Sequence, residues 1–235
     1  MYKHFFKRLI DIVLSIMGII LLAIPMLVVA IIIKIDSPGP VFFKQKRIAK
    51  GKKYFNIIKF RSMPVSAPHD TPTHQLQNSE QMLSKWQRFM RKSSIDELPQ
   101  LFCILAGSMS IIGPRPALWN QDDLIAERDK YGANDVRPGL TGWAQINGRD
   151  ELEIPVKAKL DGEYVEKLNM GKFKGVAMDM KCFFGTIASV LRSDGVVEGG
   201  TGISSSSRPL ICAHPVSPGR TSFAPYLSRS AIKSS

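Results

Sequence analysis

Cysteine is scarce in this sequence. The 235 residues include three cysteines, Cys103, Cys182 and Cys212, which lie far apart and form no Cys-x-x-Cys pair. A disulfide framework or a zinc site is therefore not expected, and the pattern suits a reducing compartment. We expect the cysteines to serve as small buried apolar side chains.

Acidic residues are few as well. The chain has 20 aspartates and glutamates against 32 lysines and arginines, which gives a formal net charge of +12. A basic protein of this kind meets an acidic partner such as nucleic acid, anionic lipid or a phosphorylated substrate, and charge alone does not choose among them. The apolar fraction of 44% excludes a wholly disordered chain. The length fits one principal domain with room for an appendage.

One long stretch lacks charge altogether. No charged residue occurs from Ile12 to Ile33, and about 20 apolar residues are enough to cross a bilayer. No small-x-small cleavage site follows, which disfavours a removed signal peptide. Pro25 interrupts the run and is expected to kink or break the helix.

The flanks of this stretch favour one membrane topology. Both flanks are rich in lysine and arginine, and such flanks stay on the cytoplasmic side. We therefore predict a re-entrant helix, which enters the membrane, bends at Pro25 and returns to the same side. A kinked helix that crosses the bilayer and a buried helix of a soluble protein remain as alternatives. Asp11 is expected to pair with Arg8 at the level of the lipid headgroups.

The remaining chain predicts a small hairpin among helices. Residues 37–40 form a turn, and residues 41–45 and 54–60 are rich in strand formers on either side of a basic loop that contains Gly51. Residues 80–92 and 180–192 have apolar and basic faces, which fit either a core-facing helix or, as we favour, a helix at an anionic membrane surface. His69 and His74 lack a third ligand, so a metal site there is not expected. From Ile203 onward the composition predicts a disordered basic tail.

An acidic pair is the most informative feature of the chain. Leu98, Leu101 and later apolar residues have helical spacing, and Gly107 is a natural stop. We expect the helix to begin at Asp96 as its cap, with Glu97 as the first helical residue. Asp96 can simply cap the helix, stabilising it by about 1 kcal/mol. Alternatively, the free N–H groups there attract phosphate and keep an aspartate ionised and nucleophilic, while the neighbouring carboxylate holds a divalent cation.

Two further clusters suit phosphate and polar recognition. Pro114 and Pro116 restrict the backbone on both sides of Arg115, and a rigidly presented guanidinium suits phosphate, although such a motif alone is more often a surface turn. Residues 136–149 are dense in glycine, amides and arginine around Trp143, which predicts a recognition loop. The chain has no P-loop, since it lacks G-x-x-x-x-G-K-[ST].

In their order and number, these motifs resemble the bacterial sugar transferase family, the monotopic polyprenyl-phosphate phosphoglycosyl transferases. The resemblance covers about residues 1 to 200. The matching pieces are Phe6-Lys7-Arg8-Leu9-Ile10-Asp11, Lys59-Phe60-Arg61-Ser62-Met63, Ser94-Ile95-Asp96-Glu97-Leu98-Pro99-Gln100-Leu101, Gly107 to Pro116, Val136-Arg137-Pro138-Gly139-Leu140-Thr141-Gly142 and Gln145-Ile146-Asn147-Gly148-Arg149.

The resemblance implies a reaction and a set of roles. Asp96 would attack a UDP-sugar, UMP would leave, and polyprenyl phosphate would accept the sugar phosphate in a ping-pong scheme. Glu97, with Asp96, would hold Mg²⁺. The other residues expected at the substrates are Lys59, Arg61, Arg91, Pro114, Arg115, Pro116, Arg137, Gln145, Asn147, Arg149, Asp161 and Tyr164. The enzyme would lie in the bacterial inner membrane with its site facing the cytoplasm, and downstream glycosyltransferases are possible partners.

The resulting expectation is an α+β protein, mainly helical with a small hairpin. Residues 1–36 would form the re-entrant membrane helix, residues 37–202 the catalytic domain and residues 203–235 the tail. The sequence departs from the family at Ile24-Pro25, where Ser-Pro is usual, and in a long stretch at residues 170–178. The rival interpretation is a membrane-anchored basic protein that binds lipid or nucleic acid without catalysis. A soluble nucleic-acid-binding domain, which gives residues 12–33 no role, is disfavoured, and no nucleic-acid partner is expected. The sequence does not name the sugar.

Overall fold

The computed structural model describes residues 2–67, 83–148 and 152–192. The chain divides into two units, Met1–Gly200 and Thr201–Ser235, and only the first contains described residues. The predicted tail, Cys212, His69, His74 and Arg149 lie outside them. Within the described residues the structure is mainly helical with two small sheets, as the α+β prediction requires.

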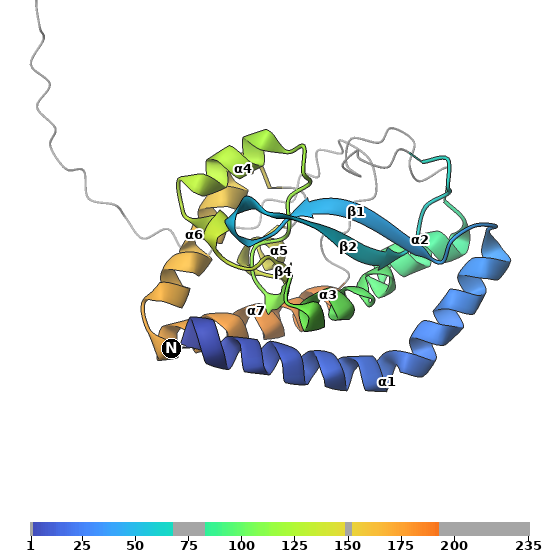
Figure 1. The fold of residues 1–235 in the computed structure, drawn as a ribbon, viewed down its shortest axis with the longest axis horizontal. Helices are drawn as coiled ribbons and strands as arrows, with labels where there is room; N and C mark the ends of the chain where they lie inside the picture. The colour runs from blue at the N-terminus through green and yellow to red at the C-terminus, as the bar shows by residue number, and fades with distance from the viewer. Residues whose placement is uncertain (1, 68–82, 149–151, 193–235) are drawn as a thin grey trace, which may run out of the picture. The chain divides into compact units, whose positions relative to one another are not determined.

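The N-terminal helix is long and bent. A short π-helical segment, Tyr2–Phe6, leads into α1, Lys7–Asp36, which has Pro25 inside it. Figure 1 shows α1 running along one side of the molecule and then turning towards α2. Among the described helices, α1 alone is long and apolar enough to cross a membrane, and 17% of its most apolar stretch is buried. Its exposure distinguishes it from the core helix of a soluble protein.

Buried polar contacts fix the first turns of α1. Asp11 is 3% exposed and accepts hydrogen bonds from Ser110 Oγ at 2.8 Å and from the Ile111 amide at 3.0 Å. Arg8 instead donates to the carbonyl oxygens of Ile104 and Leu105. The predicted Arg8–Asp11 pair is therefore wrong: both side chains bind a neighbouring segment, where backbone groups need partners.

The predicted hairpin is confirmed. Strands β1, Phe42–Ile48, and β2, Tyr54–Phe60, pair antiparallel, with Phe42 opposite Phe60 and Ile48 opposite Tyr54. The connection contains a 3-10 turn, Lys50–Lys52, in which Gly51 has a φ of 67°. Glycine adopts this left-handed conformation without steric cost.

Two short helices follow the hairpin. Helix α2, Lys85–Lys92, starts at a capping box formed by Ser84 and Gln87. Its Met90 is fully buried while Phe89 is 52% exposed, so the apolar residues expected on one face are divided between core and surface. After a 3-10 turn, Ile95–Glu97, comes α3, Gln100–Ala106, which ends at Gly107 with φ 91° as predicted.

A second sheet lies where a loop was expected. Strands β3, Ser110–Ile112, and β4, Gly139–Thr141, pair in parallel, and the short helix α5, Trp143–Ile146, follows β4. The two chain segments run so close together that a Cβ on Gly139 would lie 2.1 Å from the Gly113 nitrogen. Part of the glycine-rich 136–149 segment is thus used for close backbone packing.

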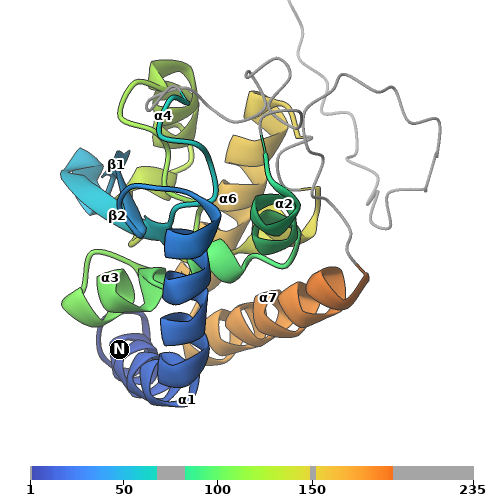
Figure 2. The ribbon, with the colours of Figure 1, turned by 90° about the vertical axis from the view of Figure 1, so that its right-hand side faces the viewer.

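The C-terminal helices complete the unit. Helices α4, Asp122–Asp129, and α6, Ile154–Asn169, pack together, with a 3-10 turn, Ala133–Asp135, beside them. Helix α7, Lys172–Arg192, begins earlier than predicted and includes most of the 170–178 stretch. In both views α7 and the first part of α1 lie on one side of the unit, with the hairpin and α4 on the other (Figures 1 and 2).

Candidate active site

The acidic pair lies in a turn before α3. Ser94 has a left-handed φ of 57°, Asp96 and Glu97 occupy the 3-10 turn, and Pro99 is the residue that caps α3. No side-chain cap hydrogen bond forms at either helix start. The prediction that Asp96 caps the helix is therefore wrong, because the tight turn places α3's free N–H groups beyond it.

Asp96 is buried among cationic side chains. It is 8% exposed, and its Oδ2 accepts a hydrogen bond from Ser62 Oγ at 3.3 Å. Burial raises the pKa of Asp96, while the positive charges of Lys59 and Arg91 oppose that rise and Glu97 adds to it. The side chains of β2 and α2 thus provide the positive environment that we expected from a helix start.

Glu97 joins two motifs that are distant in the sequence. Its Oε1 accepts from Lys59 Nζ at 2.8 Å and from Arg115 Nη2 at 2.6 Å, and Arg115 Nη1 lies 3.5 Å from Oε2. Lys59 comes from β2, and Arg115 follows β3. The structure therefore brings the acidic pair, the strand lysine and the Pro-Arg-Pro motif together.

Hydrogen bonds to the carbonyl oxygens of Pro114 and Pro116 fix the backbone on both sides of Arg115. The Pro114 oxygen accepts from the Gly139 amide at 2.8 Å, and the Pro116 oxygen accepts from Arg47 Nη1 at 3.0 Å. Neither contact involves the acidic pair. The two prolines position the guanidinium between them.

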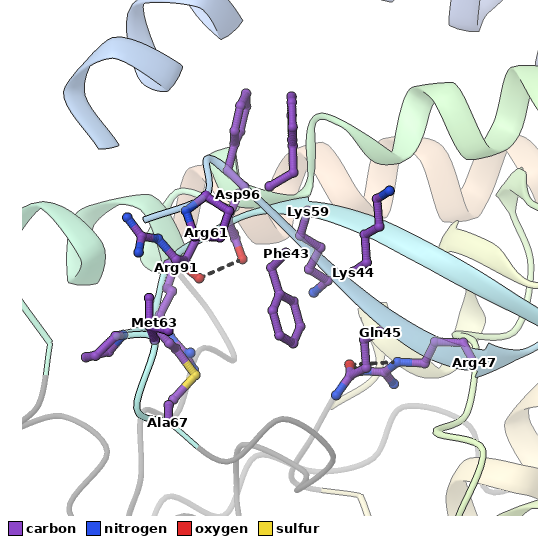
Figure 3. A pocket seen from close by; sticks show the side chains of 16 residues that line it. Phe43, Lys44, Gln45, Arg47, Lys59, Arg61, Met63, Ala67, Arg91 and Asp96 are labelled. Atoms are coloured by element: carbon purple, nitrogen blue, oxygen red, sulfur yellow. Dashed lines mark hydrogen bonds between the residues drawn. The ribbon is translucent and has the colours of Figure 1, made fainter. Parts of the chain in front are cut away.

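Asp96 lines a cavity of about 380 Å³ between the hairpin and α2, which we call the first cavity. Figure 3 shows Asp96, Arg91 and Arg61 at one end, Gln45 and Arg47 at the other, and the Phe43 ring between them. Lys59 also contributes to its wall. A cationic end beside an aromatic middle suits an anionic ligand that carries a ring.

Glu97 lines a different cavity, of about 320 Å³, which we call the second cavity. Its walls come from α1, the turn before α3, β4, α5 and α7. Arg115 and Gln145 lie in the wall with Glu97, and most of the remaining side chains are apolar. The acidic pair therefore faces two cavities, Asp96 the cationic one and Glu97 the apolar one.

Other predicted residues make hydrogen bonds that do not involve the acidic pair. Arg61 is 5% exposed and lines the first cavity, but its guanidinium donates to the carbonyl oxygens of Ser37 and Pro38. Arg137 donates to the Gly107 oxygen at 3.1 Å. Asn147 is exposed and donates to the Trp143 oxygen at 2.7 Å. These contacts hold turns and helix ends in place.

Asp161 and Tyr164 are buried on α6. Asp161 is 1% exposed and accepts two hydrogen bonds from Arg128, whose Nη1 also donates to the Arg115 oxygen. Tyr164 donates to Asp179 at 2.8 Å. Asp161 thus supports the Arg115 backbone through one intervening residue, and Tyr164 belongs to a separate polar cluster.

Sequence reasoning missed the side chains that β1 contributes. Phe43, Gln45 and Arg47 line the first cavity, and Gln45 Oε1 accepts from Arg47 Nη2 at 2.6 Å. Their spacing of two residues places them on one face of the strand, but Phe42 and Lys44 also line the cavity. Alternation alone would therefore not have identified the lining residues of β1.

The carboxylates of Asp96 and Glu97 are the candidate magnesium ligands. Among the described residues no group of three or more His, Cys, Asp or Glu side chains is placed to hold a metal ion. Magnesium, however, usually uses one or two carboxylates together with substrate phosphates. Asp96 and Glu97 fit that smaller donor set, with Glu97 Oε2 at the longer of its contacts with Arg115.

Two known proteins are similar to this chain over most of their own length. The exopolysaccharide production protein PSS of Rhizobium leguminosarum bv. phaseoli is 36% identical over 197 residues, which cover 79% of this chain and 94% of that protein. The uncharacterized sugar transferase EpsL of Bacillus subtilis (strain 168) is 37% identical over 190 residues, 81% of this chain and 89% of that one.

A longer relative is similar over part of its length. The UDP-glucose:undecaprenyl-phosphate glucose-1-phosphate transferase of Xanthomonas campestris pv. campestris is 41% identical over 144 residues, which cover 60% of this chain and 30% of that protein. The chain thus spans less than a third of that relative. The family model described as bacterial sugar transferase matches residues 2–193. The chain belongs to the bacterial sugar transferase family.

Proposed function

We propose that this protein transfers a sugar 1-phosphate from a UDP-sugar to polyprenyl phosphate and releases UMP. The observation that carries the proposal is the acidic turn, whose Asp96 lies in a cationic cavity and whose Glu97 lies in an apolar one. A water-soluble nucleotide sugar and a lipid phosphate need two such environments. The printed names of relatives, which describe transfer to undecaprenyl phosphate, support the same reaction.

The transfer is proposed to pass through Asp96 in two steps. An Asp96 carboxylate oxygen bonds to the sugar-proximal phosphorus, and the bond from that phosphorus to the UMP oxygen breaks, with the electron pair leaving on UMP. An oxygen of polyprenyl phosphate then attacks the same phosphorus, and the bond to Asp96 breaks to restore the carboxylate. This is a ping-pong scheme with a covalent intermediate.

The surrounding residues support the first step. Ser62 donates to Asp96 and fixes its orientation. Burial raises the pKa of Asp96, so the ionised carboxylate is a stronger base and nucleophile than a solvated one. Arg91 and Lys59 line the same cavity and balance the charge that develops on the departing UMP.

Glu97 is proposed to position the cationic groups that meet the substrate phosphates. In the structure it holds Lys59 Nζ and Arg115 Nη2 on one oxygen. Asp96 and Glu97 are the residues that would hold magnesium, which supplies positive charge to the pyrophosphate when bound. Lys59 and Arg115 are then placed to contact phosphate oxygens directly.

The membrane topology is proposed to be re-entrant, with the site at the cytoplasmic face of the inner membrane. Both ends of α1 contact the same domain. Lys7 at its start pairs with Asp179 of α7, while Ile33 near its end is 2% exposed and packs with Phe60 of β2. A helix that crossed the bilayer would carry these ends to opposite sides.

Labelling of cysteines introduced at both ends tests this topology. Cysteines at position 3, before α1, and at position 35, near the end of α1, should both react from the cytoplasmic side in inside-out vesicles. Reaction of either position with an impermeant reagent only from outside intact cells would overturn the re-entrant proposal.

Two half-reaction assays test the catalytic proposal. Asp96→Asn should abolish UMP release and the radiolabelled phosphosugar that remains on the denatured protein. Asp129→Asn, an exposed carboxylate whose side chain is 44% exposed, is the matched control and should retain both. Turnover in Asp96→Asn, or salt-sensitive lipid binding without UMP release in the unmodified protein, contradicts the proposal. A panel of UDP-sugars scored by UMP release identifies the donor.

A further inference from the structure

The backbone around Arg115 is held at three consecutive carbonyl oxygens. Those of residues 114, 115 and 116 accept, in that order, from the Gly139 amide at 2.8 Å, Arg128 Nη1 at 2.9 Å and Arg47 Nη1 at 3.0 Å. The donors belong to β4, α4 and β1. Two of them are guanidinium groups, which present several N–H donors in a rigid planar fork. The peptide that carries the Arg115 side chain is therefore fixed by three separate elements.

Arg128 is itself held by a buried carboxylate. Its Nε and Nη2 donate to Asp161 Oδ2 at 2.8 and 2.6 Å, and the two side chains are 4% and 1% exposed. Such a pair is often no more stabilising than two apolar side chains of similar size, because the removal of both charges from water offsets their attraction. Stability alone does not account for it. The pair fixes one orientation of the guanidinium, in which Nη1 donates to the Arg115 oxygen.

Arg128 lies outside both cavities of the candidate site. Among the described residues that line the first and second cavities, neither Arg128 nor Asp161 occurs. Arg115 does line the second cavity, and its Nη2 contacts Glu97 Oε1 at 2.6 Å. An effect of Arg128 on the reaction therefore passes through the Arg115 backbone. A displacement of about 1 Å at a group that positions the reacting atoms can reduce a rate about a hundredfold.

We infer that Arg128 is a positioning residue for the proposed transfer: it fixes the Arg115 backbone so that the Arg115 guanidinium reaches the substrate phosphates. This inference rests on the proposed function, which gives Arg115 its contact with phosphate. Asp161 acts one step further back, since it orients Arg128. The ion pair between α4 and α6 thus connects the packing of these helices with the acidic turn.

Arg128→Lys tests the inference, with Asn134→Ala as the matched control. Lysine keeps the charge beside Asp161, but its single ammonium does not reproduce the three contacts of the guanidinium. Asn134 also holds α4, by donating to one carbonyl oxygen and one carboxylate of that helix. Single-turnover formation of phosphosugar on Asp96, at saturating UDP-sugar, should slow about tenfold or more in Arg128→Lys and less than about threefold in Asn134→Ala. Rates are measured well below both melting temperatures, so that they refer to folded protein.

A combined variant decides whether Arg128 acts through Arg115. The effects of residues that act as one unit do not add, whereas independent effects multiply in the rate. Arg128→Lys together with Arg115→Lys should form phosphosugar within about threefold of the rate of Arg115→Lys alone. A further loss by the full factor that Arg128→Lys causes by itself would overturn the inference.

The outcomes separate this inference from the proposed function. If the unmodified protein forms no phosphosugar from a UDP-sugar, the proposed function fails and the inference fails with it. If the unmodified protein forms phosphosugar and Arg128→Lys forms it at the same rate, the function stands and the inference alone is overturned. The same conclusion follows if Asn134→Ala slows the reaction as much as Arg128→Lys does, because Arg128 is then only a structural residue of α4.

Discussion

Asp179 of α7 is predicted to stabilise the packing of the N-terminal segment on the rest of the fold more than any other single side chain. Its carboxylate accepts three hydrogen bonds, from Tyr2 Oη at 2.5 Å, Lys7 Nζ at 2.9 Å and Tyr164 Oη at 2.8 Å. Burial, followed by the contact with Asp179, raises the pKa of Tyr2, and burial also raises that of Tyr164. Both phenols therefore stay protonated and remain donors at neutral pH.

The cost of removing this carboxylate follows from its burial. The side chains of Lys7 and Asp179 are 11% and 10% exposed, so Asp179→Ala leaves the buried ammonium of Lys7 and the phenol of Tyr2 without this acceptor, while Tyr164 keeps the Ile112 carbonyl oxygen. Breaking a buried pair in this way costs about 3–5 kcal/mol. At roughly 2–4 °C per kcal/mol for a chain of this size, the melting temperature should fall by about 6–20 °C. Tyr2→Phe removes one hydrogen bond and should cost about 1 kcal/mol.

Thermal unfolding in detergent micelles measures these differences. Asp129→Ala is the control: its ion pair with Lys52 is exposed and should contribute about 0–1 kcal/mol, and its hydrogen bond from Asn134 should add about 1 kcal/mol. A loss in Asp179→Ala no larger than in Asp129→Ala would refute the reasoning. The hydrogen bonds from the phenols to Asp179 contribute fully to the free energy of unfolding below the ordinary tyrosine pKa near 10.0. This contribution is lost as the pH rises above that value.

Further predictions concern the site and its frame. Arg115→Lys keeps the charge but loses the two-nitrogen contact with Glu97, so steady-state assays should show turnover reduced about tenfold or more; unchanged turnover would contradict this. Because the folded pKa of Asp96 is raised from 3.8, phosphosugar formation should fall as the pH drops, with a midpoint above 3.8; single-turnover labelling at a series of pH values locates it. Gly139→Ala would put a Cβ 2.1 Å from the Gly113 nitrogen, and its melting temperature in thermal unfolding should fall by several degrees; an unchanged melting temperature would contradict this close approach.

Local patterns were enough to predict the elements that rest on local chemistry. The strand formers on either side of Gly51 specify the hairpin, since alternation and a turn residue act within a few positions. Gly107 ends α3 because the left-handed φ there suits glycine. The apolar run of residues 12–33 gives α1 its length. In each case the signal and the structure lie in the same stretch of chain.

Contacts between distant segments were not accessible in this way. Strands β3 and β4 have three residues each, too few for a period to be recognised. Asp11 was assigned to Arg8 on proximity in the sequence, but its partners lie about a hundred residues away. The motif order predicted that Lys59, Glu97 and Arg115 belong to one site, yet no pattern revealed that Arg61 would hold a turn.

The bend of α1 illustrates how the fold compensates for a local departure from the family. A serine before the proline is absent, since the chain has Ile24-Pro25. Beyond the proline, Met26, Val29 and Ile33 are spaced along one helix face and are 9% exposed or less, packed in one cluster with β2 and α2.

Arg61 then fixes the end of this half-helix. Its guanidinium donates to the Ser37 and Pro38 carbonyl oxygens at 2.6 and 2.7 Å, so the chain is tied to β2's end as it leaves α1. The direction of the second half of α1 is therefore set by burial against β2 and α2 and by this guanidinium. Ser62, which donates to Asp96, follows the same strand, so the end of β2 positions both α1 and the proposed nucleophile.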